Sequence, residues 1–284
     1  MANTAEKNAI VGGTLYLVAT PIGNMSDLSE RAVKVLSEVD FVAAEDTRNS
    51  GLMLSRLGIS KPMISYYEHN KSARGETIAA RLEAGESCAL VTDAGTPAIS
   101  DPGEDIVRLC AERGITVTSV PGCCAAVTAL TLSALGTRRF CFEGFLPVEK
   151  KERRERLDAL ASEERTMIFY EAPHKLVGTL DDLMNAFGGE RKIALCRELT
   201  KLNEDVMRTT LREAVETYKT REPRGEYVLV VDGAEKTADD YPEDIAEHVA
   251  MLEAAGLSRM DAIKAAAKAR GVKKNDIYAA VAKK

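Results

Sequence analysis

The chain has 284 residues, a formal net charge of −6, 45% hydrophobic residues and 29% charged residues. This length allows two domains with a sizeable core, and the composition is ordinary for a globular protein. No apolar run is long enough to span a bilayer and the first residues lack a signal-peptide core, so we expect a cytoplasmic protein with no membrane segment.

Short apolar runs alternate with helical patterns from Thr14 to about Leu135, which predicts a mostly parallel sheet with helices on both faces. Asp101 is expected to cap the last of these helices, with Pro102 in its first turn. The expected strands are 14–19, 41–45, 63–67, 88–93 and 116–120, and the expected helices are 29–39, 50–58, 75–85 and 102–114.

A second α/β unit is predicted after Pro147. It begins with a densely charged helix in which six basic residues balance six acidic ones between Glu149 and Arg165, so we interpret this helix as a solvated one and not as a nucleic-acid arm. Its expected strands are 166–171, 192–199, 204–211 and 226–232. A polar linker follows.

Three short helices are predicted at the end of the chain, separated by Gly256 and Gly271, with Ser258 and Asn275 as N-caps. A compact module of helix-turn-helix type is the natural expectation. We therefore divide the chain into an N-terminal α/β domain (1–146), a second α/β domain (147–235) and a C-terminal helical module (240–284).

The C-terminal module concentrates positive charge. Residues 257–284 hold eight basic residues and two acidic ones, so the rest of the chain carries the acidic excess. This asymmetry indicates a polyanionic partner, nucleic acid first, although a solvated helical face is the alternative. The basic residues are Arg259, Lys264, Lys268, Arg270, Lys273, Lys274, Lys283 and Lys284.

Four loops are expected at the carboxyl edge of the first sheet: 19–24, 44–50, 92–103 and 119–125. Together they contain one basic residue, Arg48, and neither a Gly-x-Gly-x-x-Gly motif nor a P-loop is present. A phosphate would be poorly neutralised there, whereas small residues, carbonyls and acids suit a positively charged nucleoside such as S-adenosylmethionine. Ordinary turns are the competing interpretation.

A metal site is not expected. The histidines His69, His174 and His248 are scattered, and no Cys or His stands at ligand spacing from them.

Several long segments are similar to one known family. "GTLYLVATPIGNMSDLSERAVKVLSEVDFVAAEDTRNSGLML", "LVTDAGTPAISDPG" and "SVPGCCAAVTALTLSALG" closely resemble the small-subunit rRNA cytidine 2'-O-ribose methyltransferases, as do "FEGFLP", "IFYEAPHKL", "CRELTKLNED" and "RGEYVLVV". The resemblance implies the two-domain tetrapyrrole-methylase fold of class III methyltransferases, with a small C-terminal helical module. It also implies a homodimer that methylates a cytidine ribose in the decoding region of 16S rRNA in the small ribosomal subunit.

The resemblance also assigns the cofactor. S-adenosylmethionine is expected in the cleft between the two α/β domains, and the "PGCC" stretch departs from the Pro-Gly-Pro-Ser common in the family, so contact there is expected through the backbone. Asp93 is expected to accept from polar groups of the cofactor; its alternative is an Asx-type turn. The assigned residues are Pro21, Asp93, Gly95, Thr96, Cys123, Cys124, Ala125, Tyr170, Glu226, Tyr227 and Val228.

A ribose hydroxyl is a weak nucleophile, so we expect a general base. Glu45 and Asp46 are the first candidates because two adjacent acids end a buried strand; His69 and Glu198 follow. For Asp46, capping of the helix that begins near Arg48 is about as well supported as a role as general base. Arg48 and Lys201 are expected to hold phosphates flanking the target, beside the basic residues of the C-terminal module.

Two other functions stay open at this point. One is a methyltransferase of the same fold that acts on a tetrapyrrole or another small molecule, which would have no use for the basic module. The other is a non-catalytic RNA-binding protein that holds the cofactor as a sensor.

Overall fold

The computed structural model describes residues 9–235 and 241–281, so Lys283 and Lys284 lie outside the described residues. Contacts within the chain divide it into two compact units, residues 1–233 and 234–284. The first unit contains two five-stranded sheets, and the second contains three helices.

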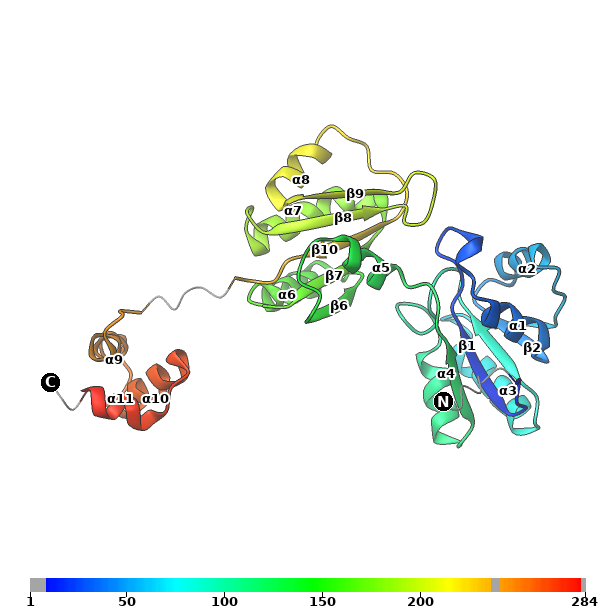
Figure 1. Cartoon of the computed structure of the whole chain (residues 1–284), viewed down its shortest axis with the longest axis horizontal. Helices are drawn as coiled ribbons and strands as arrows, with labels where there is room; N and C mark the ends of the chain where they lie inside the picture. The colour runs from blue at the N-terminus through cyan, green and yellow to red at the C-terminus, as the bar shows by residue number, and fades with distance from the viewer. Residues whose placement is uncertain (1–8, 236–240, 282–284) are drawn as a thin grey trace, which may run out of the picture. The chain divides into compact units, whose positions relative to one another are not determined.

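The first sheet, whose strands β1 and β2 are labelled in Figure 1, is wholly parallel, where a mostly parallel sheet was predicted. Its strand order is β3-β2-β4-β1-β5. Successive residues of β4 point to opposite faces: Ala89 and Val91 pack with one cluster, and Cys88 and Leu90 with the other. The first cluster takes in α1 and α2, and the second takes in α3 and α4. The strands are β1 (Thr14–Val18), β2 (Phe41–Ala44), β3 (Met63–Ser65), β4 (Cys88–Val91) and β5 (Thr116–Val120), and the helices are α1 (Glu30–Glu38), α2 (Thr47–Arg56), α3 (Lys71–Glu83) and α4 (Glu104–Glu112).

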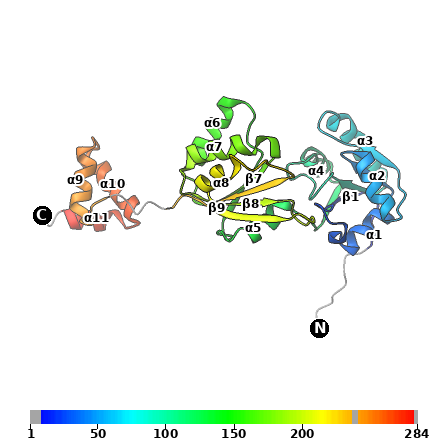
Figure 2. The same cartoon turned by 90° about the horizontal axis from the view of Figure 1, so that it is seen from above.

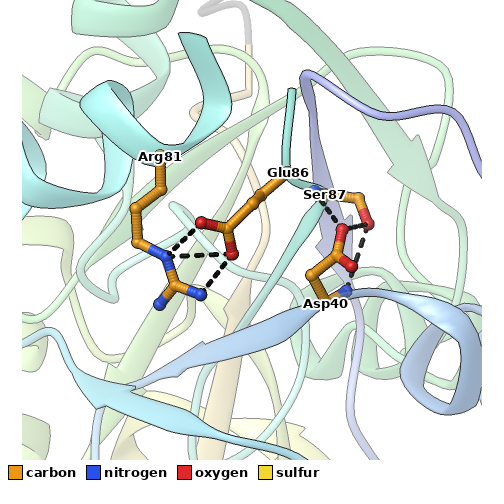
Figure 3. Close-up of polar contacts among 4 residues, drawn as sticks. All are labelled: Asp40, Arg81, Glu86 and Ser87. Atoms are coloured by element: carbon orange, nitrogen blue, oxygen red, sulfur yellow. Dashed lines mark hydrogen bonds and ion pairs between the residues drawn. The ribbon is translucent and has the colours of Figure 1, made fainter. Parts of the chain in front are cut away.

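Polar contacts tie the amino ends of β2 and β4 together (Figure 3). The backbone N–H and the hydroxyl of Ser87 each donate to the Asp40 carboxylate at 2.7 Å, which lowers the pKa of Asp40. Beside them Arg81 pairs with Glu86 and lies 3.6 Å from the centre of the Phe41 ring. This polar cluster fixes the end of the sheet opposite the carboxyl edge.

The second sheet is mixed, with order β6-β7-β10-β8-β9; β6 runs parallel to β7, and the other neighbours are antiparallel. It begins at β6, which lies before the expected boundary at residue 146. Figure 2 shows α6 and α7 on one side of this sheet and α5 on the other, in agreement with the packing clusters. The strands are β6 (Phe140–Gly144), β7 (Thr166–Glu171), β8 (Lys192–Arg197), β9 (Asp205–Thr210) and β10 (Tyr227–Val231), and the helices are α5 (Ala125–Leu132), α6 (Lys150–Leu160), α7 (Leu176–Phe187) and α8 (Leu211–Tyr218).

The second unit packs three helices, α9 (Ile245–Ala254), α10 (Arg259–Arg270) and α11 (Lys274–Val281), around a small apolar core. Ser258 caps α10 as predicted, with its hydroxyl accepting from the Asp261 N–H. Asn275 is not an N-cap, because α11 already begins at Lys274. Gly271 takes the left-handed conformation, with φ of 63°, and allows a short turn between α10 and α11.

Candidate active site

A cavity of about 490 Å³ lies where the loops of the first sheet meet the second sheet. This volume suits a small ligand or cofactor. Most of the residues assigned to the cofactor line it: Gly95, Thr96, Cys124, Ala125, Tyr170, Glu226, Tyr227 and Val228. Pro21, Asp93 and Cys123 do not, although Ile22, next to Pro21, does.

Hydrogen bonds join the loops around the cavity to one another. Thr20 and Gly95 exchange two backbone hydrogen bonds, at 2.9 and 3.0 Å. The Thr96 hydroxyl donates to the Cys123 carbonyl at 2.9 Å, so Cys123 holds the wall through its backbone. Across the cavity, the Ala126 N–H donates to the Tyr170 hydroxyl at 3.2 Å, and burial raises the pKa of Tyr170 to about 12.

The loop between β4 and α4 has an unusual backbone. Ala98 and Ser100 adopt φ angles of 67° and 60°, in the left-handed region that residues with a Cβ rarely occupy. Such strain gathers at functional sites. The conformation brings Ile99, Ser100 and Asp101 into the cavity wall.

Asp101 is therefore not the predicted helix cap. The helix α4 begins at Glu104, with Gly103 at the N-cap position and no side-chain capping bond, and Gly103 has φ of 146°. Burial first, and then the charges of Glu45 and Asp93, raise the pKa of Asp101 to about 6. The local sequence resembles a capping sequence, but the positive-φ turns place this carboxyl in the cavity instead.

The cavity is acidic. Asp101, Glu171 and Glu226 line it, together with His174, and among the residues that the structure describes no lysine or arginine does. Glu171 is buried and accepts from the Thr179 hydroxyl and, at 2.9 Å, from the Ala172 N–H. The absence of cationic side chains matches the expectation of a site for a positively charged nucleoside and not for a phosphate.

The residues proposed as general base do not line this cavity in the described part of the chain. Asp46 caps α2, accepts from the Arg48 N–H at 2.8 Å and pairs with the Arg48 guanidinium, and the hydrogen bonds from Arg48 lower its pKa to about 2. Asp46 is therefore the cap of α2, which was the alternative to a role as general base. The pKa of Glu45 is raised mainly by burial, and to a smaller extent by the charges of Asp93 and Asp46. His69 makes an edge contact with Tyr67, with ring centres 6.2 Å apart.

Asp93 accepts from the Asn49 side chain at 2.9 Å and is exposed. Its carboxylate thus links the loop after β4 to α2.

Lys201 forms ion pairs with two carboxylates of the same chain. Its ammonium group donates to Glu198 at 2.9 Å and to Glu226 at 2.6 Å. Burial lowers the pKa of Lys201, but these two hydrogen bonds outweigh it and raise the pKa overall. Lys201 was expected to contact a phosphate of the RNA. In the structure its charge is instead neutralised by Glu198 and by Glu226, which lines the cavity.

Sequence reasoning missed much of the cavity's second half. Phe145, Glu171 and His174 lie in segments that carried the family resemblance, but the sequence assigned none of them to the site. Phe145 packs on the edge of Tyr170 with ring centres 5.7 Å apart and keeps 57% of its surface exposed. His174 belongs to a short 3-10 turn, Pro173–Lys175, between β7 and α7.

In the helical unit, Arg270 serves the fold. Its guanidinium donates to the carbonyls of Pro242, Glu243 and Asp244 and, at 3.1 Å, to His248 Nδ1. Lys264 pairs with Asp261 at 2.9 Å. Arg259, Lys268 and Lys273 are exposed and make no ion pair with a described residue, whereas Lys274 is half-buried beside Tyr278.

Residues 14–215 match the model of the tetrapyrrole (corrin/porphyrin) methylases. The chain is 45% identical over 270 residues to ribosomal RNA small subunit methyltransferase I of Synechocystis sp., covering 94% of this chain and 96% of the relative. It is also 45% identical over 268 residues to the protein of the same name from Escherichia coli O157:H7, covering 94% and 93%. The chain belongs to this family. It is a methyltransferase.

Solved structures agree on the fold of this methyltransferase. A uroporphyrin-III C-methyltransferase from Thermus thermophilus aligns with a TM-score of 0.56 and 22% identity, over 78% of this chain and 94% of its own. A cobalt precorrin-4 methyltransferase aligns with a TM-score of 0.59 and 17% identity, over 78% and 95%. The class III fold inferred from the sequence is thereby confirmed.

Two further features of the methyltransferase bear on cofactors and membranes. Within residues 9–235 and 241–281, no cluster of three or more His, Cys, Asp or Glu residues could hold a metal ion. In the same residues, no helix combines the length and apolar character that a membrane crossing requires.

Proposed function

We propose that this methyltransferase uses S-adenosylmethionine to methylate the ribose 2'-hydroxyl of a cytidine in the decoding region of 16S rRNA. The observation that carries the proposal is the acidic cavity without cations, formed by the loops at the carboxyl edge of the parallel sheet and by the second sheet. The names of the relatives support the choice of small-subunit rRNA.

The residues present fit the cofactor. Gly95, Cys124 and Ala125 offer a small-residue wall that a ligand can approach closely, and Tyr227 and Val228 add apolar surface from β10. The carboxylate of Glu226 offers a partner for an amino group or a sulfonium. S-adenosylmethionine bound there would supply an activated methyl group, which needs no metal for its transfer.

The protein then has to position and activate the hydroxyl. Holding the reacting groups in line is itself a large part of catalysis. Asp101 is the side chain best suited to accept the hydroxyl proton, because it lines the cavity and its pKa of about 6 leaves it ionised, yet basic, near neutral pH. We infer that Asp101 takes the role for which Glu45, Asp46 and His69 were predicted.

Recognition of RNA is assigned in part to the exposed basic residues of the helical unit, Arg259, Lys268 and Lys273. We also infer a homodimer, which light scattering on the purified chain tests directly.

Methyl transfer to small ribosomal subunits tests the proposed function. Labelled S-adenosylmethionine is incubated with subunits from a strain that lacks this enzyme, with wild type and Asp101→Asn side by side, and the label is mapped by nucleoside analysis. Label on a cytidine ribose, strongly reduced in the variant, supports the proposal. If a folded protein binds the cofactor but labels neither subunits nor free 16S rRNA, the substrate is wrong, and tetrapyrroles and other small acceptors are tested next. If no acceptor is labelled, the non-catalytic alternative gains support.

A further inference from the structure

A second cavity, of about 690 Å³, lies between α6, α7 and the segment that joins β6 to α6. We call it the α6–α7 groove. Its lining combines apolar residues with four lysine and arginine side chains and two aspartates, Asp158 and Asp182. The lining residues on which the argument depends are Val148, Lys150, Arg153, Arg154, His174 and Lys175.

Three of the cations on this groove have no partner among the described residues. Lys150, Arg154 and Lys175 are exposed, and none of them makes an ion pair or side-chain hydrogen bond with any residue that the structure describes. By contrast, the neighbouring Lys151 pairs with Glu155 at 3.9 Å and does not line the groove. The even charge balance of this helix along the sequence therefore hides an uneven distribution around it.

Arg153, the fourth cation, is built into the groove wall. It donates to Asp182 at 2.6 Å and to the Thr179 hydroxyl at 2.8 Å, and 17% of its side chain is exposed. Thr179 in turn donates to Glu171, which lines the candidate active site. A chain of hydrogen bonds thus couples the groove wall to the wall of the active-site cavity.

The groove also adjoins that cavity directly. His174 lines both. The connection after β6 does the same, with Phe145 in the cavity wall and Val148, 79% exposed, in the groove. A strand whose target nucleotide enters the cavity therefore meets Phe145, an aromatic surface of the kind on which unstacked bases lie, and then the three unpaired cations.

We propose that the α6–α7 groove binds the sugar-phosphate backbone of the RNA strand next to the nucleotide that enters the active site. The inference rests on the proposed function, because it takes RNA as the substrate. It replaces the sequence-based interpretation of residues 149–165 as a merely solvated helix. Lys150, Arg154 and Lys175 contact phosphates, and Arg153 positions the groove wall.

The test compares wild type with a Lys150→Ala, Arg154→Ala, Lys175→Ala variant in the full-length chain. Affinity for a 16S rRNA transcript is measured over a salt series, along with kcat and KM for subunits and the Kd of S-adenosylmethionine. The control variant carries Lys34→Ala, Lys151→Ala and Lys219→Ala, three exposed lysines that have helical ion pairs and line neither cavity.

We expect the groove variant to bind RNA about tenfold or more weakly and to lose about two to three units of the slope of log Kd against log salt. KM for RNA should rise, whereas the Kd of the cofactor and the unfolding temperature should match those of the control. Equal RNA affinity and equal slope in the two variants overturn the proposal. So does a defect seen only with assembled subunits and not with the free transcript, which indicates that the groove contacts a protein.

Failure of the groove proposal is separable from failure of the proposed function. If wild type methylates rRNA and the groove variant does so equally well, only the groove assignment is wrong. If wild type itself neither binds nor methylates rRNA, the proposed function fails first and the groove proposal falls with it.

Discussion

The ammonium group of Lys201 lies 2.6 Å from a carboxylate oxygen of Glu226, a residue of the cavity wall, and 2.9 Å from Glu198. The loop that carries Lys201 also meets the first loop of the parallel sheet, because a Cβ on Gly23 would lie 2.5 Å from Lys201 Cγ. Lys201 thus joins the two halves of the site, and its positive charge is already partnered.

We therefore expect Lys201→Met to act on the cofactor and not on RNA. Two carboxylates lose their partner beside the cavity, so the Kd of S-adenosylmethionine should rise by about tenfold. The salt dependence of RNA binding should stay at the wild-type slope. A lowered slope with unchanged cofactor affinity would instead restore the original expectation that Lys201 contacts a phosphate. Lys34→Met serves as the control.

Asp101 should cause the fall of kcat at low pH, the acid limb of the pH–rate profile. Only the ionised carboxylate can accept a proton, so kcat should fall as the pH drops through about 6. Asp101→Asn should lower kcat by about 10²–10⁴ and remove this limb, with little change in the Kd of the cofactor. A pH–rate profile that keeps the same limb in the variant contradicts the assignment.

The same residue should affect stability with a defined sign. The pKa of Asp101 is raised by folding, so the folded state binds the proton more tightly than the unfolded state does, and stability is lost as pH rises from about 4 to about 6. Asp101→Asn should thus raise the free energy of unfolding at pH 8 by about 1 kcal/mol, because the carboxyl is only partly buried. Denaturant titrations should show this gain vanishing near pH 4.

The hydrogen bond from Thr96 to the Cys123 carbonyl should matter for cofactor binding. Thr96→Val keeps the side-chain volume but leaves the carbonyl without this donor, at a cost of about 1 kcal/mol or more. We expect the Kd of S-adenosylmethionine to increase roughly fivefold or more in calorimetric titrations. Thr77→Val, which removes a hydroxyl that donates to the Ala73 carbonyl within α3 and does not line the cavity, should leave the Kd unchanged.

Arg270 should prove structural, contrary to the expectation that it contacts RNA. Its guanidinium satisfies carbonyls at the start of α9 and lies 4.5 Å from the centre of the Tyr241 ring. Arg270→Ala should destabilise the helical unit by about 1–3 kcal/mol, seen as faster amide exchange in α9 and α10. Lys268→Ala should leave exchange unchanged and weaken RNA binding. Normal protection in the Arg270 variant would return this residue to the candidate RNA contacts.

Much of the architecture followed from local sequence alone. Alternating apolar runs located all five strands of the parallel sheet, and the single basic residue in the edge loops led to the expectation of a cationic ligand. These features are legible because a strand's burial pattern and a turn's residue types act over a few neighbouring positions. The mixed pairing of the second sheet, whose strands contact one another across long stretches of chain, was not predicted.

Tertiary structure alone decided which side chains share a cavity. The residues around Asp101 predict a helix cap. Positive φ angles at Ser100 and Gly103 instead place Asp101 in the wall of the active-site cavity. Lys150 and Lys151 are indistinguishable by sequence, and only the packing of α6 against α7 places one of them on the groove beside His174. Such assignments depend on contacts between residues far apart in the chain, and a residue's type and immediate neighbours do not encode them. The sequence therefore determined the family and indicated the edge of the sheet at which the candidate site lies, and the fold determined which residues meet there.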